Sequence, residues 1–159
     1  MSIYKDHFDK RLADAAAAEQ KLTADAAKAA EQRSANLALG KAWLESIAVP
    51  ELNDAKSGLI SDLTIDFTES VALRRSDEGI FHEIRFTMNP KRYSGNRSFT
   101  FVVCADEGGK IWTECRKPAD DNEPERLIRK DKLSGPASAL GSTHFQAYLK
   151  QRIDDAMKL

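Results

Sequence analysis

Residues 2–48 read SIYKDHFDKRLADAAAAEQKLTADAAKAAEQRSANLALGKAWLESIA, a stretch with no proline and a single glycine, Gly40. Apolar or small side chains recur along it at steps of three, four and their sums, which is the period of one helical face. That row consists of Tyr4, Phe8, Leu12, Ala15, Leu22, Ala26, Ala30, Leu37, Leu44 and Ala48, interrupted by Glu19, Arg33 and Gly40. The sequence therefore predicts a long N-terminal helical region, either one very long helix or two helices in series.

The length and composition of this region indicate a helix-helix contact. One continuous helix would be about 70 Å long, whereas a compact domain of this chain length has a radius of gyration of about 15 Å. The alanines of residues 13–30 favour helix but bury little area. Such a seam needs another helix, from a partner chain or from a fold-back capped at Thr23 or Ser34. A solvated helix without a partner is the alternative.

The bulkiest side chains of the row are the residues that we expect to mediate self-association: Tyr4, Phe8, Leu12 and Leu22. Alternatively, the first three pack back on their own domain. We expect residues 1–33 to be a helical appendage or oligomerisation segment, and residues 34–159 to be a single α+β domain. A homo-oligomer is the expected state.

After the breaker Lys56-Ser57-Gly58, the pattern predicts a four-stranded antiparallel meander. The first strand covers residues 59–73, with Glu69 marking a bulge. The others cover residues 80–88, 99–103 and 111–116. Residues 125–133 fit either a short helix or a fifth edge strand, and the sequence does not choose between them.

A C-terminal helix closes the predicted fold. Thr143 and Gln146 have the spacing of a capping box, and an apolar stripe follows, formed by Phe145, Leu149, Ile153 and Met157 and widened by Tyr148 and Ala156. We expect this stripe to pack on the sheet, giving an α+β fold. The order of elements resembles the cystatin-like class in architecture alone. No residue motif supports a family, so this resemblance implies no function.

Charge and cysteine content restrict the classes of function. The 24 basic and 25 acidic residues nearly cancel, so no global charge favours nucleic acid or an anionic membrane. The first residues are charged, unlike a signal peptide, and no stretch approaches the roughly 20 apolar residues of a membrane span. Cys104 and Cys115 are expected on opposite faces of the sheet. We therefore expect reduced thiols in a cytoplasmic protein.

Motifs for catalysis, metal or cofactor binding are missing from the sequence. His7, His82 and His144 fall in different predicted elements, and none has further ligands at metal-site spacing. No nucleophile elbow or Walker loop is present, so we expect no cofactor, no metal site and no catalytic residues. One enzymatic or ligand-binding hypothesis centres on His82, which shares a strand face with apolar residues. Its pocket would include Cys104, Cys115 or Tyr148, although a histidine there is more often part of the core.

The best local binding signal is cationic. Lys91, Arg92, Tyr93 and Arg97 gather in one hairpin loop, where arginine and an aromatic ring can contact phosphate and stack on a base. The same mixture can recognise an acidic protein surface. A second basic cluster comprises Arg126, Arg129, Lys130 and Lys132.

Three classes of function follow. The first is a non-enzymatic protein of adaptor, chaperone or inhibitor type, which self-associates or docks a protein partner through its N-terminal helix. The second is a nucleic-acid-binding module that uses the basic loop 91–97. The third is the small-ligand pocket or enzyme around His82. We expect the first, because the long helix needs an explanation and no catalytic constellation is present.

Overall fold

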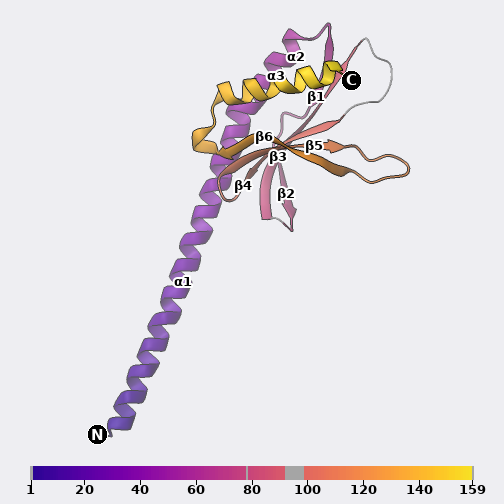
Figure 1. Cartoon of the computed structure of the whole chain (residues 1–159). Helices are drawn as coiled ribbons and strands as arrows, with labels where there is room; N and C mark the ends of the chain where they lie inside the picture. The colour runs from indigo at the N-terminus through magenta and orange to yellow at the C-terminus, as the bar shows by residue number, and fades with distance from the viewer. Residues whose placement is uncertain (1, 78, 92–98, 159) are drawn as a thin grey trace. The chain divides into compact units, whose positions relative to one another are not determined.

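The computed structural model describes residues 2–77, 79–91 and 99–158 and has an α+β fold (Figure 1). A long helical region comes first, an antiparallel sheet follows, and a helix ends the chain. The chain divides into two units, Met1–Ala35 and Asn36–Leu159.

The first helix, α1, is continuous from Ile3 to Trp43. Thr23 and Ser34, the two candidate caps for a fold-back, both lie inside it. The Thr23 hydroxyl donates to the Glu19 carbonyl, one helical turn earlier, at 3.0 Å. Such a bond leaves the backbone ladder intact. Of the two alternatives, one long helix is therefore correct.

The helical region continues beyond Ala48, where the sequence pattern ends. A π-helical turn, η1 (Leu44–Ala48), leads into α2 (Val49–Gly58). Pro50 explains this turn, because proline has no N–H and its ring crowds the carbonyl four residues earlier. The wider turn relieves that crowding, and the Val49 N–H donates to the Leu44 carbonyl.

The described residues form six strands in one antiparallel sheet, so the predicted number of four was wrong. They are β1 (Leu63–Phe67), β2 (Ala72–Ser76), β3 (Gly79–Pro90), β4 (Thr100–Asp106), β5 (Lys110–Lys117) and β6 (Arg126–Pro136). The order across the sheet is β1-β3-β4-β5-β6, and β2 pairs with the other half of β3. The long β3 thus organises one edge of the sheet.

The predicted first strand is divided between β1 and β2. Phe67 pairs with Phe86, and Ala72 pairs with Glu83. Residues 68–71 therefore lie opposite residues 84–85 alone, so two extra residues leave the ladder. Because two is an even number, the side chains on both sides of the break keep the same parity. This is why the alternation reads as one strand with a local bulge.

Residues 126–136 form the edge strand β6, so the strand alternative for this region holds rather than the helix. The β5–β6 pairing contains two irregularities, one between Trp112 and Glu114 and one between Cys115 and Arg116. At the first, residues 131–133 lie opposite Thr113 alone. A bulge of this kind bends the edge and redirects its side chains.

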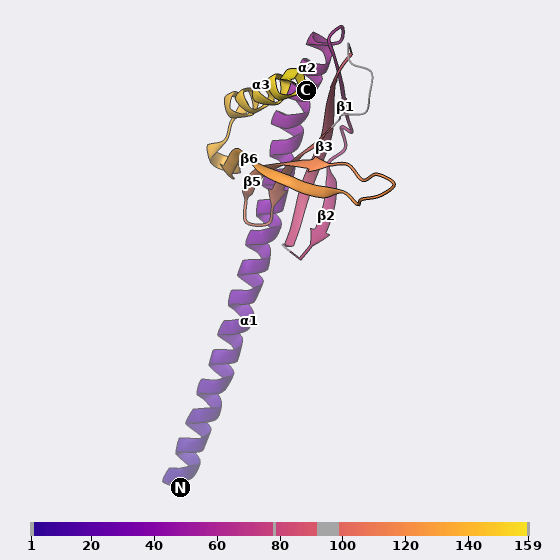
Figure 2. The same ribbon diagram turned by 45° about the vertical axis from the view of Figure 1, so that its right-hand side comes forward.

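The end of α1, together with α2 and the last helix, covers one face of the sheet (Figure 2). The last helix, α3, spans Ser142–Lys158. Trp43 joins α1 to it: its indole N–H donates to the Leu140 carbonyl at 2.8 Å, and its ring meets Phe145 edge-on at 5.7 Å. The centre of the core consists of the fully buried residues Leu44, Leu52, Ile65, Ile84, Phe86, Val103, Ile111 and Phe145.

The expected apolar stripe of α3 is buried at Phe145, Tyr148, Leu149 and Ala156, half-buried at Ile153, and exposed at its end, where Met157 is 37% exposed. The capping box was wrong. Gln146 donates to the Glu51 carboxylate at 2.9 Å, and the His144 ring accepts a hydrogen bond from the Gly141 N–H at 3.0 Å.

Both cysteines are unbonded, as expected. Cys115 belongs to the core, and Cys104 pairs with Glu83 on the other face of the sheet. Burial raises the pKa of both thiols.

Gly40, one of the interruptions in the apolar row, lets α1 approach β4. A Cβ at this position would lie 2.7 Å from the Cβ of Ala105. We expect Gly40→Ala to destabilise the body: the clash costs about 3 kcal/mol, the upper end for overpacking, and higher helix propensity returns about 1 kcal/mol. Urea unfolding measures the difference. Gly58→Ala, where no atom lies within 4 Å of the added Cβ, is the control and should be neutral or stabilising. Equal stabilisation by both would contradict the close contact.

Candidate functional site

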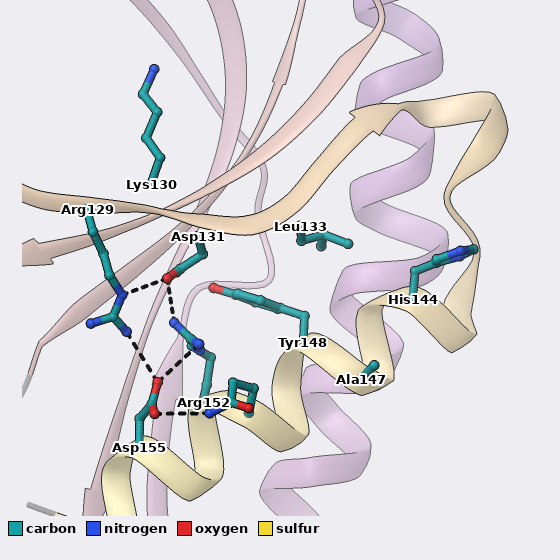
Figure 3. A pocket seen from close by; sticks show the side chains of 10 residues that line it. Arg129, Lys130, Asp131, Leu133, His144, Ala147, Tyr148, Arg152 and Asp155 are labelled. Carbon is teal, nitrogen blue, oxygen red and sulfur yellow. Dashed lines mark hydrogen bonds and ion pairs between the residues drawn. The ribbon is translucent and has the colours of Figure 1, made fainter.

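A pocket of about 660 Å³ lies between β6 and α3 (Figure 3). Its lining residues are Arg129, Lys130, Asp131, Leu133, His144, Ala147, Tyr148, Gln151, Arg152 and Asp155. Its size falls within the range of small-molecule sites. We take it as the candidate functional site.

The β6 wall of the pocket depends on the bulge opposite Thr113. The irregularity turns Asp131 and Leu133 toward α3 (Figure 3). The Thr113 hydroxyl donates to the Leu133 carbonyl at 3.4 Å, which holds the bulged backbone. The Asp131 side chain is 3% exposed, so this edge strand carries a carboxylate into the interior.

The α3 wall is formed by residues one turn apart. Tyr148 and Arg152 follow Phe145 at steps of three and four, and therefore share its buried stripe. Tyr148 and Arg152 are each 7% exposed. An arginine at a core position requires a carboxylate partner, since a buried unpaired charge is costly.

Two arginines and two aspartates join the walls. Arg152 Nη1 lies 2.5 Å from Asp131 Oδ1, and Arg152 Nη2 lies 3.1 Å from Asp155 Oδ2. Arg129 Nε lies 2.9 Å from Asp131 Oδ1, and Arg129 Nη2 lies 3.2 Å from Asp155 Oδ2. The hydrogen bond with Asp131 raises the pKa of Arg129. The two positive and two negative charges cancel, and the pairs Asp131–Arg152 and Arg129–Asp155 connect β6 to α3.

Aromatic rings complete the environment of Arg152. Its guanidinium carbon lies 5.8 Å from the ring centre of Phe101 and 5.3 Å from that of Tyr148. Cation-π contacts of this kind partly replace the lost hydration of the guanidinium.

Three polar atoms of the site are buried without a hydrogen-bond partner: Asp131 Oδ2, Tyr148 Oη and Arg152 Nε. Burial, and then the charge of Asp131, raise the pKa of Tyr148 well above its ordinary value, so its hydroxyl stays protonated. In Figure 3 this hydroxyl points toward Asp131 and Arg152, whereas His144 lies at the other end of the pocket and Lys130 points away from α3. Unpaired buried polar groups are rare and indicate a function or a missing partner.

The residues of the expected basic loop are mostly undescribed. Arg92, Tyr93 and Arg97 lie outside the described residues. Lys91 follows β3, its side-chain ammonium donates to the Ile60 carbonyl, and its backbone N–H donates to the Asp62 carbonyl at 3.0 Å. Lys91 thus helps to hold the chain that enters β1.

The expected second basic cluster separates. Arg129 joins the pocket, where two aspartates offset its charge. Arg126 and Lys130 are exposed along β6.

The residues expected to mediate self-association are all exposed within one chain. The exposed fractions are 80% for Tyr4, 61% for Phe8, 55% for Leu12 and 71% for Leu22.

His82 does not form the dyad with a cysteine that the sequence left open. It is half-buried on the face that carries Ile84, whereas Cys104 lies on the opposite face, because its neighbour Ala105 is the residue that pairs with His82. Cys115 shares the core face but pairs with Phe101, four residues along β4 from Ala105, which is about 13 Å away. Burial, and then the charge of Lys41, lower the pKa of His82, against an opposing effect of Glu45. Its Nδ1 is buried and unpaired.

The opposite face of the sheet carries a second set of buried charges. Glu83, 3% exposed, accepts hydrogen bonds from Arg74 Nε at 2.7 Å and Arg85 Nε at 2.9 Å. Glu114 accepts from the Trp112 indole at 3.0 Å and from Arg116 Nε at 2.9 Å. Because these carboxylates are paired, we interpret this set as structural.

Known proteins give no further guidance, since no protein family, curated protein or solved structure matches this chain. Among the described residues, no cluster of three or more His, Cys, Asp or Glu side chains could hold a metal ion. Over the same residues, no helix has both the length and the apolar character needed to cross a bilayer.

Sequence reasoning missed the pairing of Asp131 with Arg152 and of Arg129 with Asp155. Each pair is more than 20 positions apart in sequence, so no local spacing reveals it. The available signal was Arg152, which occupies a core position in the stripe of α3 and therefore demands an acidic partner.

We expect Asp131→Ala to destabilise the body by about 3 kcal/mol, because it leaves Arg152 buried with one partner fewer. Urea unfolding with fluorescence detection tests this. Glu123→Ala is the control, since Glu123 pairs with Lys117 at 3.6 Å with both side chains well exposed, and its loss should cost less than about 1 kcal/mol. Equal effects of the two variants would show that the buried cluster contributes nothing special.

We also expect His82 to make stability depend on pH. Its pKa is lowered in the folded state from the ordinary value of 6.5. The unfolded chain therefore binds more protons between the two pKa values, and the free energy of unfolding falls as pH decreases through that window. Urea unfolding at pH 7.5 and 5.5 measures the loss, which His82→Asn should reduce. His7→Asn, at an exposed position, is the control, and an unchanged slope in His82→Asn would refute the assignment.

Proposed function

We propose that this chain is a non-enzymatic interaction protein. It self-associates through the part of α1 that lies before Asn36, in the first of the two units. One observation carries the proposal: every described residue from Ser2 to Ala35 is exposed, large apolar side chains included. A contiguous exposed apolar surface on a soluble chain commonly marks an interaction site. The occupant that we propose is a second copy of the same chain.

The spacing of the seam fits helix pairing. Two series with a step of seven run along the segment: Phe8, Ala15, Leu22 and Ala29, and, offset from them, Leu12, Glu19, Ala26 and Arg33. Steps of four and three therefore alternate along it, as at the a and d positions of a coiled coil. Alanine at several of these positions permits two backbones to approach closely.

The charges of the seam favour an antiparallel pair. In a parallel pair in register, Glu19 would face Glu19 of the partner and Arg33 would face Arg33, which is repulsive. An antiparallel pair centred near residue 17 avoids both contacts and brings Leu12 of each chain against Leu22 of the other. In that arrangement Phe8 lies opposite Ala26, so a large side chain meets a small one.

The flanking positions support the same stagger. In this pattern Leu12 and Ala26 occupy a-type positions, and Arg11 and Asp25 come directly before them. An antiparallel pair brings residues at that flanking position of the two chains together. With the two leucines in contact, Arg11 of each chain lies beside Asp25 of the other, giving two ion pairs. Apolar contact and charge complementarity thus agree on one arrangement.

The other expectations from the sequence remain predictions. Nucleic-acid binding through loop 91–97 rests on residues outside the described part of the chain. A cytoplasmic location remains part of the proposal, supported by the two unbonded cysteines.

The test combines the solution mass with a charge swap. Light scattering on a sizing column should give a dimer for the full chain and a monomer after deletion of residues 1–33. Leu12→Ala with Leu22→Ala should weaken the dimer by more than about 1 kcal/mol per leucine. Arg11→Glu should also weaken it, and adding Asp25→Arg should restore it.

Lys10→Glu is the matched control, because it makes the same charge change next to Arg11 at a position that the proposed pair turns outward. It should leave the dimer intact. A monomeric full chain would refute self-association. A dimer that the charge swap does not restore would refute the antiparallel arrangement while leaving the association standing.

A further inference from the structure

The pocket between β6 and α3 contains three buried polar atoms that no other group satisfies: Asp131 Oδ2, Tyr148 Oη and Arg152 Nε. They come from two elements and belong to side chains that face one another (Figure 3). The remaining atoms of the two charged groups are already engaged in the ion pairs of the cluster.

The three atoms have a defined hydrogen-bonding character. Arg152 Nε can only donate, and Tyr148 Oη donates as a neutral hydroxyl. The side chain of Thr113 lies near this hydroxyl and affects its pKa. The two do not form a hydrogen bond, and Thr113 instead donates to the Leu133 carbonyl. Asp131 Oδ2 can only accept. A ligand group that satisfies all three atoms must therefore accept two hydrogen bonds, from Arg152 and Tyr148, and donate one, to Asp131.

A hydroxyl is the group with this character, having two lone pairs and one proton. A carboxylate has no proton to donate to Asp131. Inorganic phosphate keeps a P–OH at neutral pH, but its negative charge would lie against the carboxylates of Asp131 and Asp155. An ammonium group cannot accept from Tyr148 or Arg152. The cluster itself is neutral, so it offers no net attraction to either ion.

The pocket has room for more than one hydroxyl. A water molecule could satisfy the three atoms, but it takes about 30 Å³, far less than the 660 Å³ of the pocket. The rim adds exposed polar side chains, Gln151 and His144, and half-exposed Arg129, while Ala147 and Leu133 add apolar surface. We propose that this pocket binds a neutral polyhydroxylated small molecule, such as a monosaccharide or polyol, with one hydroxyl among Asp131, Tyr148 and Arg152.

Entry of that hydroxyl requires a side chain to move, because the three atoms are buried. Arg129 is the member of the cluster at the rim, with its side chain 47% exposed. Its displacement leaves Arg152 paired with both aspartates. Movement of Arg129 is therefore the change that leaves Arg152 paired.

The experiment is ligand-observed NMR of the full chain with D-glucose, D-ribose and myo-inositol at low millimolar concentration. Thermal stabilisation alone is unsuitable, because sugars stabilise most proteins by exclusion from their surface. Inorganic phosphate and methylammonium are the charged comparison probes. We expect at least one neutral polyol to bind, and neither ion to compete with it.

Tyr148→Phe is the diagnostic variant, and Tyr4→Phe, at an exposed tyrosine of α1, is its matched control. Loss of one hydrogen bond should weaken polyol binding about tenfold in Tyr148→Phe and leave it unchanged in Tyr4→Phe. Removal of an unpaired hydroxyl should leave the unfolding midpoint of the free protein unchanged or higher.

Three results would overturn the proposal. These are no binding by any of the three polyols, binding that Tyr148→Phe does not weaken, and displacement of the polyol by phosphate. A lower unfolding midpoint in ligand-free Tyr148→Phe would also count against it, because the hydroxyl would then already have a partner.

Discussion

The close contact of α1 with β4 at Gly40 is the constraint on which the body of this protein depends. Glycine at this position allows the helix axis to lie nearer to the sheet than any side chain would permit. Trp43 and Leu44 follow within about one turn and enter the core as a result. The π turn then redirects the chain, so Leu52 of α2 reaches the same core. One helical region thus supplies both the support and much of the interior of the sheet's covered face.

Side-chain period was enough to predict much of the fold. The alternation along β3 correctly separated the face of Ile84 and Phe86 from that of Glu83. It could not reveal the break between β1 and β2, because two inserted residues preserve parity. It also left β6 undecided, because the four consecutive charged residues 129–132 interrupt any apolar alternation. Charges on an edge strand protect it against aggregation.

The candidate site could not be predicted from the sequence for a different reason. It depends on the bulge that turns Asp131 inward and on the docking of α3, neither of which has a local signal. Arg152 was the informative residue, since it interrupts an apolar stripe at a position that faces the sheet. A buried pair of this kind adds little net stability over apolar packing. We interpret it as a source of specificity. Asp131 of β6 pairs with Arg152 of α3, and Arg129 of β6 pairs with Asp155 of α3, and these two pairs fix the position of α3 along β6.

The two units obtain their stability from different sources. In Asn36–Leu159 helices and strands share an apolar core, whereas between Ser2 and Ala35 no described side chain is buried. That segment still has an advantage over an isolated peptide: α1 continues into the body, where the turns around Gly40 and Trp43 are held by packing. The first turn of a helix is unfavourable to form, with a nucleation constant of about 10⁻³. Here the packed turns already serve as the nucleus, so residues 2–35 only have to extend an existing helix. Helical order supplied in this way weakens with distance from the nucleus. In the proposed dimer, a partner helix across residues 8–26 would stabilise a part of α1 that the body does not support, so association and helix formation would reinforce each other.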